Sequence, residues 1–230
     1  MSKKHSSIVR RQFNSEDKTY DKEVRVVLPY YEAMHRKVIG AASFNPKKPI
    51  EILDLGIGTG ETALGLLKKF PNASVTGIDL SPKMMAVAKR RLKYFSKHVK
   101  FMEADMSEFL PQQKYDAGVS VLAVHHLNGK EKQKLFLKIC NALKEKGIFV
   151  IGDLIIGNNK KETKRMEQAW QNHIASRLGK KEADKWIILY RREDMPDSIK
   201  DQLKWLKQAG FKSTRCIWHK GNCAVIIGKR

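Results

Sequence analysis

The sequence lacks the long apolar runs that a membrane-spanning protein needs. No stretch of its 230 residues approaches the roughly 20 apolar residues with which a helix crosses a bilayer. Residues 1–13 (MSKKHSSIVRRQF) are basic but contain no apolar run of the kind found in secretory signals. We therefore expect a cytoplasmic protein that has no membrane partner.

Cysteine is scarce, since the chain contains only three. Cys140, Cys216 and Cys223 are an odd number, and their spacing matches no metal-binding motif. This pattern excludes a disulfide framework and is typical of reduced thiols in the cytosol. We accordingly expect no bound metal. Internal repeats and low-complexity segments are absent as well.

Acidic side chains are few relative to basic ones. The chain has 45 Lys and Arg against 24 Asp and Glu, a net charge of +21. The excess is spread along the whole chain rather than gathered in one segment. Such a diffuse charge attracts anionic partners, but it is equally typical of a solvated, lysine-rich surface. Nucleic-acid binding is therefore possible but not favoured.

What the sequence does contain is an alternation of short apolar runs with helical patterns. The runs are IEILDL, SVTGID, VKFMEAD, YDAGVSVLAV and GIFVIGDLI, and helices are expected over 60–70, from Ser81-Pro82 onward, and near 129–145. This alternation predicts a parallel sheet with helices on both faces and the strand carboxyl ends at one edge. The final hairpin, FKSTRCIWHKGNCAVIIGKR, should place the last strand antiparallel within that sheet.

The length fits one domain, residues 1–230. Residues 1–20 are polar, and the very end of the chain is expected to be loose, whereas apolar side chains at helical spacing over Asp21–Ala42 predict one amphipathic helix. The predicted segments are an N-terminal helical cap (1–45), a cofactor-binding core (46–157), a helical lid inserted after the fifth strand (158–196), and a helix with the C-terminal hairpin (197–230).

The most informative stretch is ILDLGIGTG, a glycine-rich loop between a strand and a helix. Its free backbone N–H groups could bind a phosphate, but Glu61 replaces the third glycine of a dinucleotide fingerprint and no P-loop lysine follows. Asp54 would oppose a phosphate dianion by several kcal/mol at an effective dielectric near 20, whereas it would favour an ammonium or sulfonium group. The loop therefore predicts a positively charged cofactor, which excludes ATP and disfavours NAD.

Two further acids end the next predicted strands. Asp79 is placed to accept hydrogen bonds from ribose hydroxyls, and Asp105 from an exocyclic amine such as that of adenine. Met106, Leu80 and Met84 could hold the base between them. Each acid alone is more often a helix cap, but three at these intervals favour a nucleoside cofactor.

The stretches ILDLGIGTG, VTGIDLSPKMMAVAKRRL, KFMEADM and YDAGVSVLAVHHL together resemble the class I S-adenosylmethionine-dependent methyltransferases. The resemblance implies a Rossmann-like, doubly wound α/β fold with seven strands in the order 3-2-1-4-5-7-6. It implies the cofactor S-adenosyl-L-methionine, with S-adenosyl-L-homocysteine as product. It also implies these contacts: Asp54, Gly56, Gly58, Thr59 and Gly60 around the methionine part, Asp79 on the ribose, Asp105 on the adenine, and Ser120 and Val121 along the cofactor.

The VHHL ending is most similar to small-molecule methyltransferases of the ubiquinone and menaquinone biosynthesis type. In such proteins an N-terminal helix with a Tyr-Asp pair often closes over the cofactor. Tyr20 and Asp21 match that pair, and Arg25 could reach the cofactor carboxylate.

His125 and His126 are the candidate catalytic residues, at the end of the fourth predicted strand. Adjacent strand residues point to opposite faces, so we expect one of them to face the acceptor. We favour His125 as a general base that helps an in-line methyl transfer, with His126 packed beneath it as a structural residue. The alternative is that His125 only orders the loop.

The helical lid should supply the acceptor pocket. The Arg191-Arg192 pair would suit an anionic, carboxylate-bearing small molecule, although a solvated charge pair is the simpler interpretation. The candidate acceptor residues are Tyr30 and Tyr31 from the first helix and Trp170, His173, Trp186, Tyr190 and Arg191 from the lid.

Two other functions stay open at this point. A tRNA or rRNA methyltransferase would suit the basic charge, but VLAVHHL replaces the Asn/Asp-Pro-Pro-aromatic motif typical of enzymes that act on base amines. A protein that binds the cofactor without transferring its methyl group is the second alternative. The sequence is compatible with a monomer or a homodimer.

Overall fold

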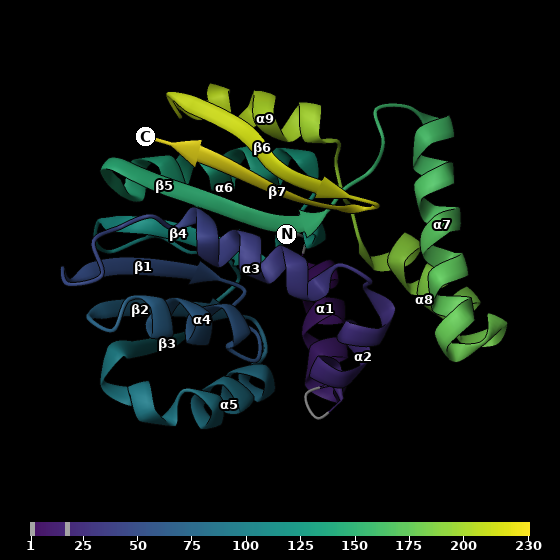
Figure 1. Cartoon of the computed structure of the whole chain (residues 1–230), viewed down its shortest axis with the longest axis horizontal. Coiled ribbons are helices and arrows are strands. Elements are labelled where there is room, and N and C mark those ends of the chain that lie inside the picture. The colour runs from purple at the N-terminus through teal and green to yellow at the C-terminus, as the bar shows by residue number, and fades with distance from the viewer. Residues whose placement is uncertain (1–2, 17–18) are drawn as a thin grey trace.

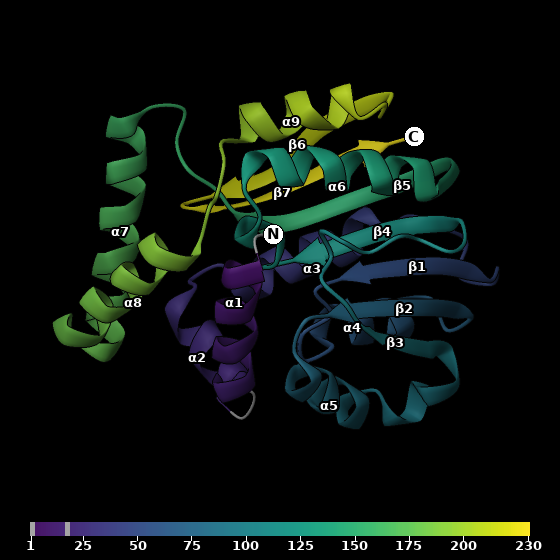
Figure 2. The same ribbon diagram turned by 180° about the vertical axis from the view of Figure 1, so that it is seen from behind.

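The computed structural model describes residues 3–16 and 19–230. A seven-stranded sheet with helices on both faces forms its centre (Figures 1 and 2). The strands are β1 (Ile50–Leu55), β2 (Ala73–Asp79), β3 (Val99–Glu103), β4 (Tyr115–Val121), β5 (Leu143–Leu154), β6 (Ser213–Lys220) and β7 (Cys223–Lys229). The helices are α1 (Lys3–Glu16), α2 (Tyr20–Val27), α3 (Tyr31–Ala41), α4 (Glu61–Lys69), α5 (Pro82–Arg91), α6 (Gly129–Ala142), α7 (Lys160–Leu178), α8 (Lys180–Glu193) and α9 (Ile199–Gln208), with 3₁₀ turns η1 (Lys93–His98) and η2 (Val124–His126).

The strand order is β3-β2-β1-β4-β5-β7-β6, which confirms the predicted fold class and topology. Strands β1 to β5 are mutually parallel, while β7 is antiparallel to both β5 and β6. The carboxyl ends of the parallel strands therefore share one edge. In Figure 1 the arrows of β1 and β5 point toward this edge, where α1, α2, α7 and α8 gather.

Alternating apolar side chains build one core on each face of the sheet. Ile52 and Val150 belong to one buried cluster, and their chain neighbours Leu53 and Ile151 belong to the other. Helices α3 and α4 contribute to the first cluster, and α6 and α9 to the second. No helix within the described residues is both long and apolar enough to span a membrane.

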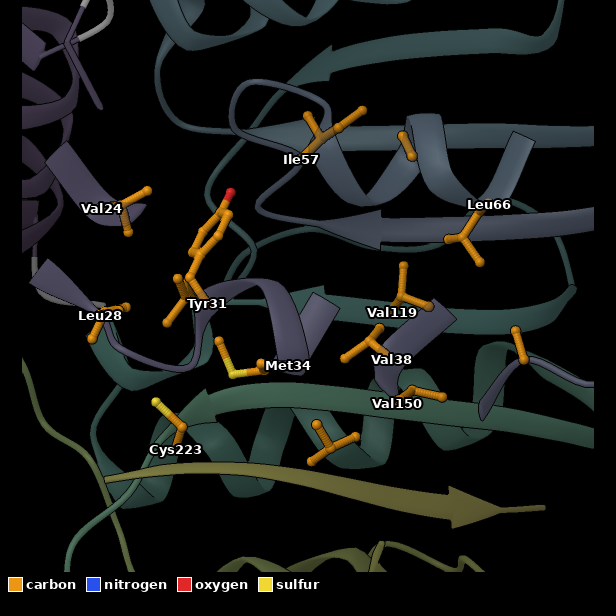
Figure 3. Packing of buried hydrophobic residues seen from close by; sticks show 14 of the residues in the cluster. Val24, Leu28, Tyr31, Met34, Val38, Ile57, Leu66, Val119, Val150 and Cys223 are labelled. Carbon is orange, nitrogen blue, oxygen red and sulfur yellow. The ribbon is translucent and has the colours of Figure 1, made fainter. Parts of the chain in front are cut away.

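Helix α3 packs directly on β5. Met34 and Val38 are fully buried, and Figure 3 shows Val38 beside Val119 and Val150. A Cβ at Gly152 would lie 2.7 Å from Val38 Cγ2 and 3.0 Å from Met34 Cγ, so no side chain fits between helix and strand. This contact fixes α2 and α3 above the carboxyl edge of the sheet.

The very end of the chain, which we expected to be loose, lies outside the described residues. Residues 3–16 form α1, whereas residues 1, 2, 17 and 18 lie outside the described residues. Ser6 Oγ donates to Asp105 at 2.6 Å and Ser81 Oγ to Asn14 at 2.7 Å, so tertiary contacts stabilise a helix whose own pattern is polar.

The structure corrects the prediction of a single helix over Asp21–Ala42, since this segment forms two helices, α2 and α3. Leu28 adopts an extended conformation directly before Pro29. Proline removes a backbone donor and clashes with the preceding turn, so the helix ends there even though the apolar spacing continues.

The predicted lid is helical, as α7 and α8, which turn at Gly179 with φ of +86°. Trp170 Nε1 donates to the Val27 carbonyl at 2.9 Å, and His173 Nε2 lies 3.0 Å from the Val26 carbonyl. Side chains of the lid therefore bind the main-chain carbonyls of α2.

Candidate active site

A first pocket lies at the ends of β1, β2 and β4, and we call it the glycine-loop pocket. Helices α1 and α2 cover it with Val9, Phe13 and Tyr20. The residues predicted to bind the cofactor that line it are Tyr20, Gly56, Gly58, Thr59, Asp79, Leu80, Met84, Met106 and Val121.

The three loop glycines all have positive φ but serve different purposes. A Cβ at Gly56 would lie 2.4 Å from Ala123 Cβ, so this glycine permits close packing of the η2 loop. A Cβ at Gly60 would meet Ala88 on α5 at 3.1 Å, and Gly60 does not line the pocket. A Cβ at Gly58 would meet nothing nearer than the Gly56 carbonyl at 3.9 Å. Gly58 thus leaves free space above its main chain for a ligand.

Asp79 is held in place by two neighbouring loops. Its carboxylate accepts the Gly58 N–H and the Ser81 N–H, both at 2.8 Å. Burial raises the pKa of Asp79, while these backbone donors counteract part of that effect. The carboxylate lines the pocket with a fixed orientation, as an acceptor of ribose hydroxyls requires.

Asp54 lies behind the pocket wall rather than on it. It is 1% exposed, and its Oδ2 finds no hydrogen-bond partner within the described residues. Burial and the charge of Asp79 raise the pKa of Asp54 to about 7. The predicted contact with a ligand ammonium group would give this buried oxygen the partner that it lacks.

Asp105 was expected to face the adenine, but it does not line the pocket. It accepts hydrogen bonds from Ser6 Oγ at 2.6 Å and from the Ser107 N–H at 2.8 Å. Burial alone would raise the pKa of Asp105, but these bonds outweigh burial and lower it. Its neighbours Ala104 and Met106 line the pocket instead.

Arg25 and Ser120 also differ from expectation, since neither lines the pocket. The Arg25 guanidinium forms ion pairs with Glu32 and Glu61, the latter at 3.1 Å. Ser120 Oγ donates to the Leu55 carbonyl at 2.7 Å and so joins β4 to β1. Both side chains contact other residues of the protein instead of lining the pocket.

A second pocket, which we call the lid pocket, lies between α1, α2, α7, α8 and η2. Three of the predicted acceptor residues, Trp170, Trp186 and Tyr190, line it. His125, which was predicted to face the acceptor, also lines it, as do His126 and Tyr20. Sequence reasoning missed the other members, which are the polar residues Gln12, Glu23, Glu193 and Asp194 and the apolar residues Phe13, Val24, Val27, Leu28, Leu122, Leu154 and Leu189.

Four predicted acceptor residues lie outside the lid pocket. Tyr31 lines the glycine-loop pocket, and the Tyr30 ring packs edge-on against Trp218. The imidazole of His173 faces the α2 main chain, as described above. The guanidinium of Arg191 is exposed and pairs with Glu167.

The two pockets adjoin each other. Phe13, Tyr20, Leu122 and His126 line both. The Phe13 and His126 rings meet edge-on with centroids 5.5 Å apart. Leu122 has φ of +53°, a conformation rare outside glycine, and such strained residues cluster at functional sites.

The two histidines lie in η2, not in the strand as predicted. Because the chain turns there, their rings do not point to opposite faces: the centroids of His125 and His126 are 4.2 Å apart, and both line the lid pocket. His126 additionally reaches the glycine-loop pocket.

Asp153, at the end of β5, holds His125. Its carboxylate accepts the His125 N–H at 2.9 Å and the Leu154 N–H at 2.8 Å, and it bonds His125 Nδ1. Burial alone would lower the pKa of His125, but the carboxylates of Asp153 and Asp194 outweigh burial and raise it. The signal for Asp153 was present in GIFVIGDL, an acid at a strand end like Asp79.

His126 is buried without a hydrogen-bond partner for either ring nitrogen within the described residues. Its Nδ1 lies 3.3 Å from Asp194 Oδ1, but without hydrogen-bond geometry. Burial and the neighbouring His125 lower the pKa of His126. His125, His126 and Asp194 offer ligand atoms within 4.8 Å of one another, a donor set of the kind that transition metals use.

Comparisons with known proteins identify the family of the chain. Residues 52–147 match the methyltransferase domain family. The chain is 31% identical to carboxy-S-adenosyl-L-methionine synthase of Nautilia profundicola, over 77% of this chain and 76% of the relative. It is 25% identical to demethylmenaquinone methyltransferase of Tropheryma whipplei, over 92% and 86%.

Solved structures share the fold. A complex of DhpI with S-adenosylhomocysteine has a TM-score of 0.67 at 15% identity, covering 96% of this chain and 93% of that one. Human N-acetylserotonin methyltransferase in complex with S-adenosylmethionine has a TM-score of 0.62 at 16% identity, covering 95% of this chain and 58% of that one. The chain belongs to the class I S-adenosylmethionine-dependent methyltransferases, and S-adenosylmethionine is its cofactor.

Proposed function

We propose that this enzyme transfers the methyl group of S-adenosylmethionine to a small molecule bound in the lid pocket. The shared border of the two pockets carries this proposal, because a cofactor in one pocket and an acceptor in the other would meet at Leu122 and His126. Similarity to a demethylmenaquinone methyltransferase and to a malonyl-[acyl-carrier protein] O-methyltransferase of Ilyobacter polytropus supports methyl transfer as the reaction.

The glycine-loop pocket would hold the cofactor through few polar groups. Asp79 would accept the ribose hydroxyls, Asp54 would balance the ammonium group, and Leu80, Met84 and Met106 would contact the base. S-adenosylmethionine supplies a methyl group already activated by its sulfonium. The protein's own contribution is therefore alignment of acceptor and methyl group and exclusion of water by the lid.

His125 is the proposed general base. Asp153 takes the Nδ1–H, which leaves the Nε2 lone pair on the side of the lid pocket. The raised pKa of His125 makes it a stronger proton acceptor. A positioned base of this kind contributes about 10²–10⁴-fold to a rate. Asp153 acts through His125 and is a positioning residue.

Similarity to the Nautilia protein raises a second reaction, the formation of a carboxylated cofactor. That product carries an additional carboxylate, which a nearby cation would stabilise. Among the described residues that line the lid pocket there are three acids, Glu23, Glu193 and Asp194, and no Lys or Arg. The pocket charge therefore favours methyl transfer over this alternative.

Calorimetry with S-adenosylhomocysteine tests the cofactor site. Asp79→Asn should weaken binding at least about 100-fold, because hydrogen bonds to a charged acceptor contribute about 1.5–3 kcal/mol each. Glu103→Gln is the matched control, since Glu103 also ends a strand but pairs with Arg10 outside the pocket. No binding by the unmodified protein, or equal affinities of the two variants, would overturn the proposal.

Mass spectrometry after incubation with methyl-deuterated S-adenosylmethionine tests the reaction. Label in a small molecule supports methyl transfer. A cofactor that has gained a carboxyl group instead would assign the second reaction.

A further inference from the structure

The charge of the lid pocket is opposite to that of the chain. Lys and Arg make up 45 of 230 residues, yet none lines this pocket among the described residues. Its charged lining consists of Glu23, Glu193 and Asp194 beside the two histidines. Asp153 balances the charge of a protonated His125 and Arg192 balances that of Glu193, so Glu23 and Asp194 remain as an excess of carboxylates in the lining. Such a field attracts cations and repels anions.

Glu193 is a buried carboxylate with one unused oxygen. The residue is 4% exposed, and its Oε1 receives the guanidinium of Arg192, which lies largely in solvent. Its Oε2 is buried and has no hydrogen-bond partner within the described residues. A buried carboxylate oxygen is unfavourable unless a donor reaches it. The lining position of Glu193 allows a ligand to supply that donor.

Aromatic rings form much of the remaining lining. They belong to Phe13, Tyr20, Trp170, Trp186 and Tyr190, from four helices. Aromatic faces attract cations through the ring quadrupole and also bury an apolar ligand body. Rings beside carboxylates therefore suit a compound that combines a cationic head with an apolar body.

From these three observations we propose that the methyl acceptor is an amine, a small molecule whose ammonium group faces Glu193 and Asp194 and whose apolar body lies among the lid aromatics. This inference rests on the proposed methyl transfer and names its acceptor class. An ammonium offers up to three N–H donors, whereas a hydroxyl offers one and a carboxylate offers none.

The charges in the reaction agree with this assignment. The ammonium gives one proton to His125 Nε2, and the freed nitrogen lone pair forms the C–N bond to the methyl group. The C–S bond breaks, and its electron pair stays on the sulfur of S-adenosylhomocysteine. Positive charge thus moves from sulfur to the acceptor nitrogen, where Glu193 and Asp194 stabilise it. His125 then releases its proton to water, and the product is a methylated ammonium.

Three small molecules that share a phenyl ring and differ in the polar group test the inference: 2-phenylethylamine, 2-phenylethanol and phenylacetate. Each is titrated into protein saturated with S-adenosylhomocysteine, with Trp170 and Trp186 fluorescence or heat as the signal. We expect the amine to bind at least about tenfold tighter than the alcohol and phenylacetate to bind weakest. Equal affinities, a preference for phenylacetate, or no binding of any probe would overturn the amine assignment. Failure of S-adenosylhomocysteine to bind would instead overturn the proposed function.

Glu193→Gln adds a second, independent readout. It should weaken the amine about tenfold and leave the alcohol unchanged, because only the charged head uses the carboxylate. Bound S-adenosylhomocysteine reports that the variant is folded. Glu167→Gln is the control, since Glu167 lies on the lid but pairs with Arg191 outside the pocket. Equal losses for amine and alcohol, or no loss for either, would contradict the proposal.

Discussion

The two pockets differ in how their carboxylates are held. In the glycine-loop pocket, Asp79 receives backbone N–H groups from the loops after β1 and β2. In the lid pocket, Glu193 ends α8 and Asp194 follows it, both carboxylates interact with side chains, and one Glu193 oxygen has no partner within the described residues. The first pocket is thus set by main-chain geometry and the second by side chains. A fold can keep the first arrangement while the second changes with the acceptor.

The largest effect expected from this comparison concerns a residue that lines only the lid pocket. His125→Ala should lower the single-turnover rate of methyl transfer about 100-fold or more, because the acceptor loses its proton acceptor. Affinity for S-adenosylhomocysteine should stay unchanged. His173→Ala is the control, as that imidazole bonds the α2 main chain outside both pockets. A fall of less than about tenfold would leave His125 with a structural role only.

A smaller effect should distinguish the two pockets when alanine replaces a glycine with positive φ inside or outside the glycine-loop pocket. Gly58 and Gly179 both have positive φ, and a Cβ at either meets no atom closer than 3.9 Å. Alanine should cost about 1–2 kcal/mol of stability at Gly58 and more at Gly179, whose φ of +86° and ψ of +162° lie in a region that essentially only glycine adopts. Only Gly58→Ala should also weaken S-adenosylhomocysteine, by about tenfold or more, since its Cβ enters the glycine-loop pocket. If calorimetry gives both variants the same affinity, the glycine loop does not contact the cofactor.

The pH dependence of cofactor binding should reflect Asp54, whose pKa is raised to about 7. A cationic ammonium favours the charged carboxylate, so binding below that pKa requires release of a proton. Affinity should then rise about tenfold between about pH 6 and pH 8 and level off above. Asp54→Asn should abolish this rise in calorimetric titrations. A pH-independent affinity in the unmodified protein would remove Asp54 from ammonium recognition.

The pH dependence of the methyl-transfer rate should instead reflect the titration of His125 in the lid pocket. A general base must be unprotonated, and the pKa of His125 is raised, so the rate should increase with pH through an inflection above the usual histidine range. Asp153→Asn removes one carboxylate that raises this pKa. Its inflection should therefore move to lower pH, whereas a merely structural loss would lower the rate at every pH without moving the inflection.

The smallest expected effect is that of a chelator. If Nε2 of His125 carries the lone pair that accepts a proton, EDTA should leave the transfer rate unchanged. A loss of activity that Zn²⁺ or Mn²⁺ restores would reassign His125, His126 and Asp194 as a metal centre.

The sequence by itself determined the sheet and the placement of the glycine loop and Asp79 at its carboxyl edge. Strand periodicity, the Ser81-Pro82 helix start and the positions of Asp54 and Asp79 are local signals, and strand ends of a parallel sheet must meet at one edge. Gly58 and Asp79 therefore came together as predicted, 2.8 Å apart between N and Oδ2.

Only the tertiary structure decided the lid pocket and the role of each candidate within it. Helix α1 has little apolar pattern and is stabilised by distant contacts such as that of Ser6 with Asp105, an acid that does not line the pocket. Asp194 after α8 and Asp153 at the end of β5 both approach His125, and helix rotation decides which side chains face inward. A one-dimensional pattern carries no such information, because helix packing angles and side-chain directions depend on the partner surfaces.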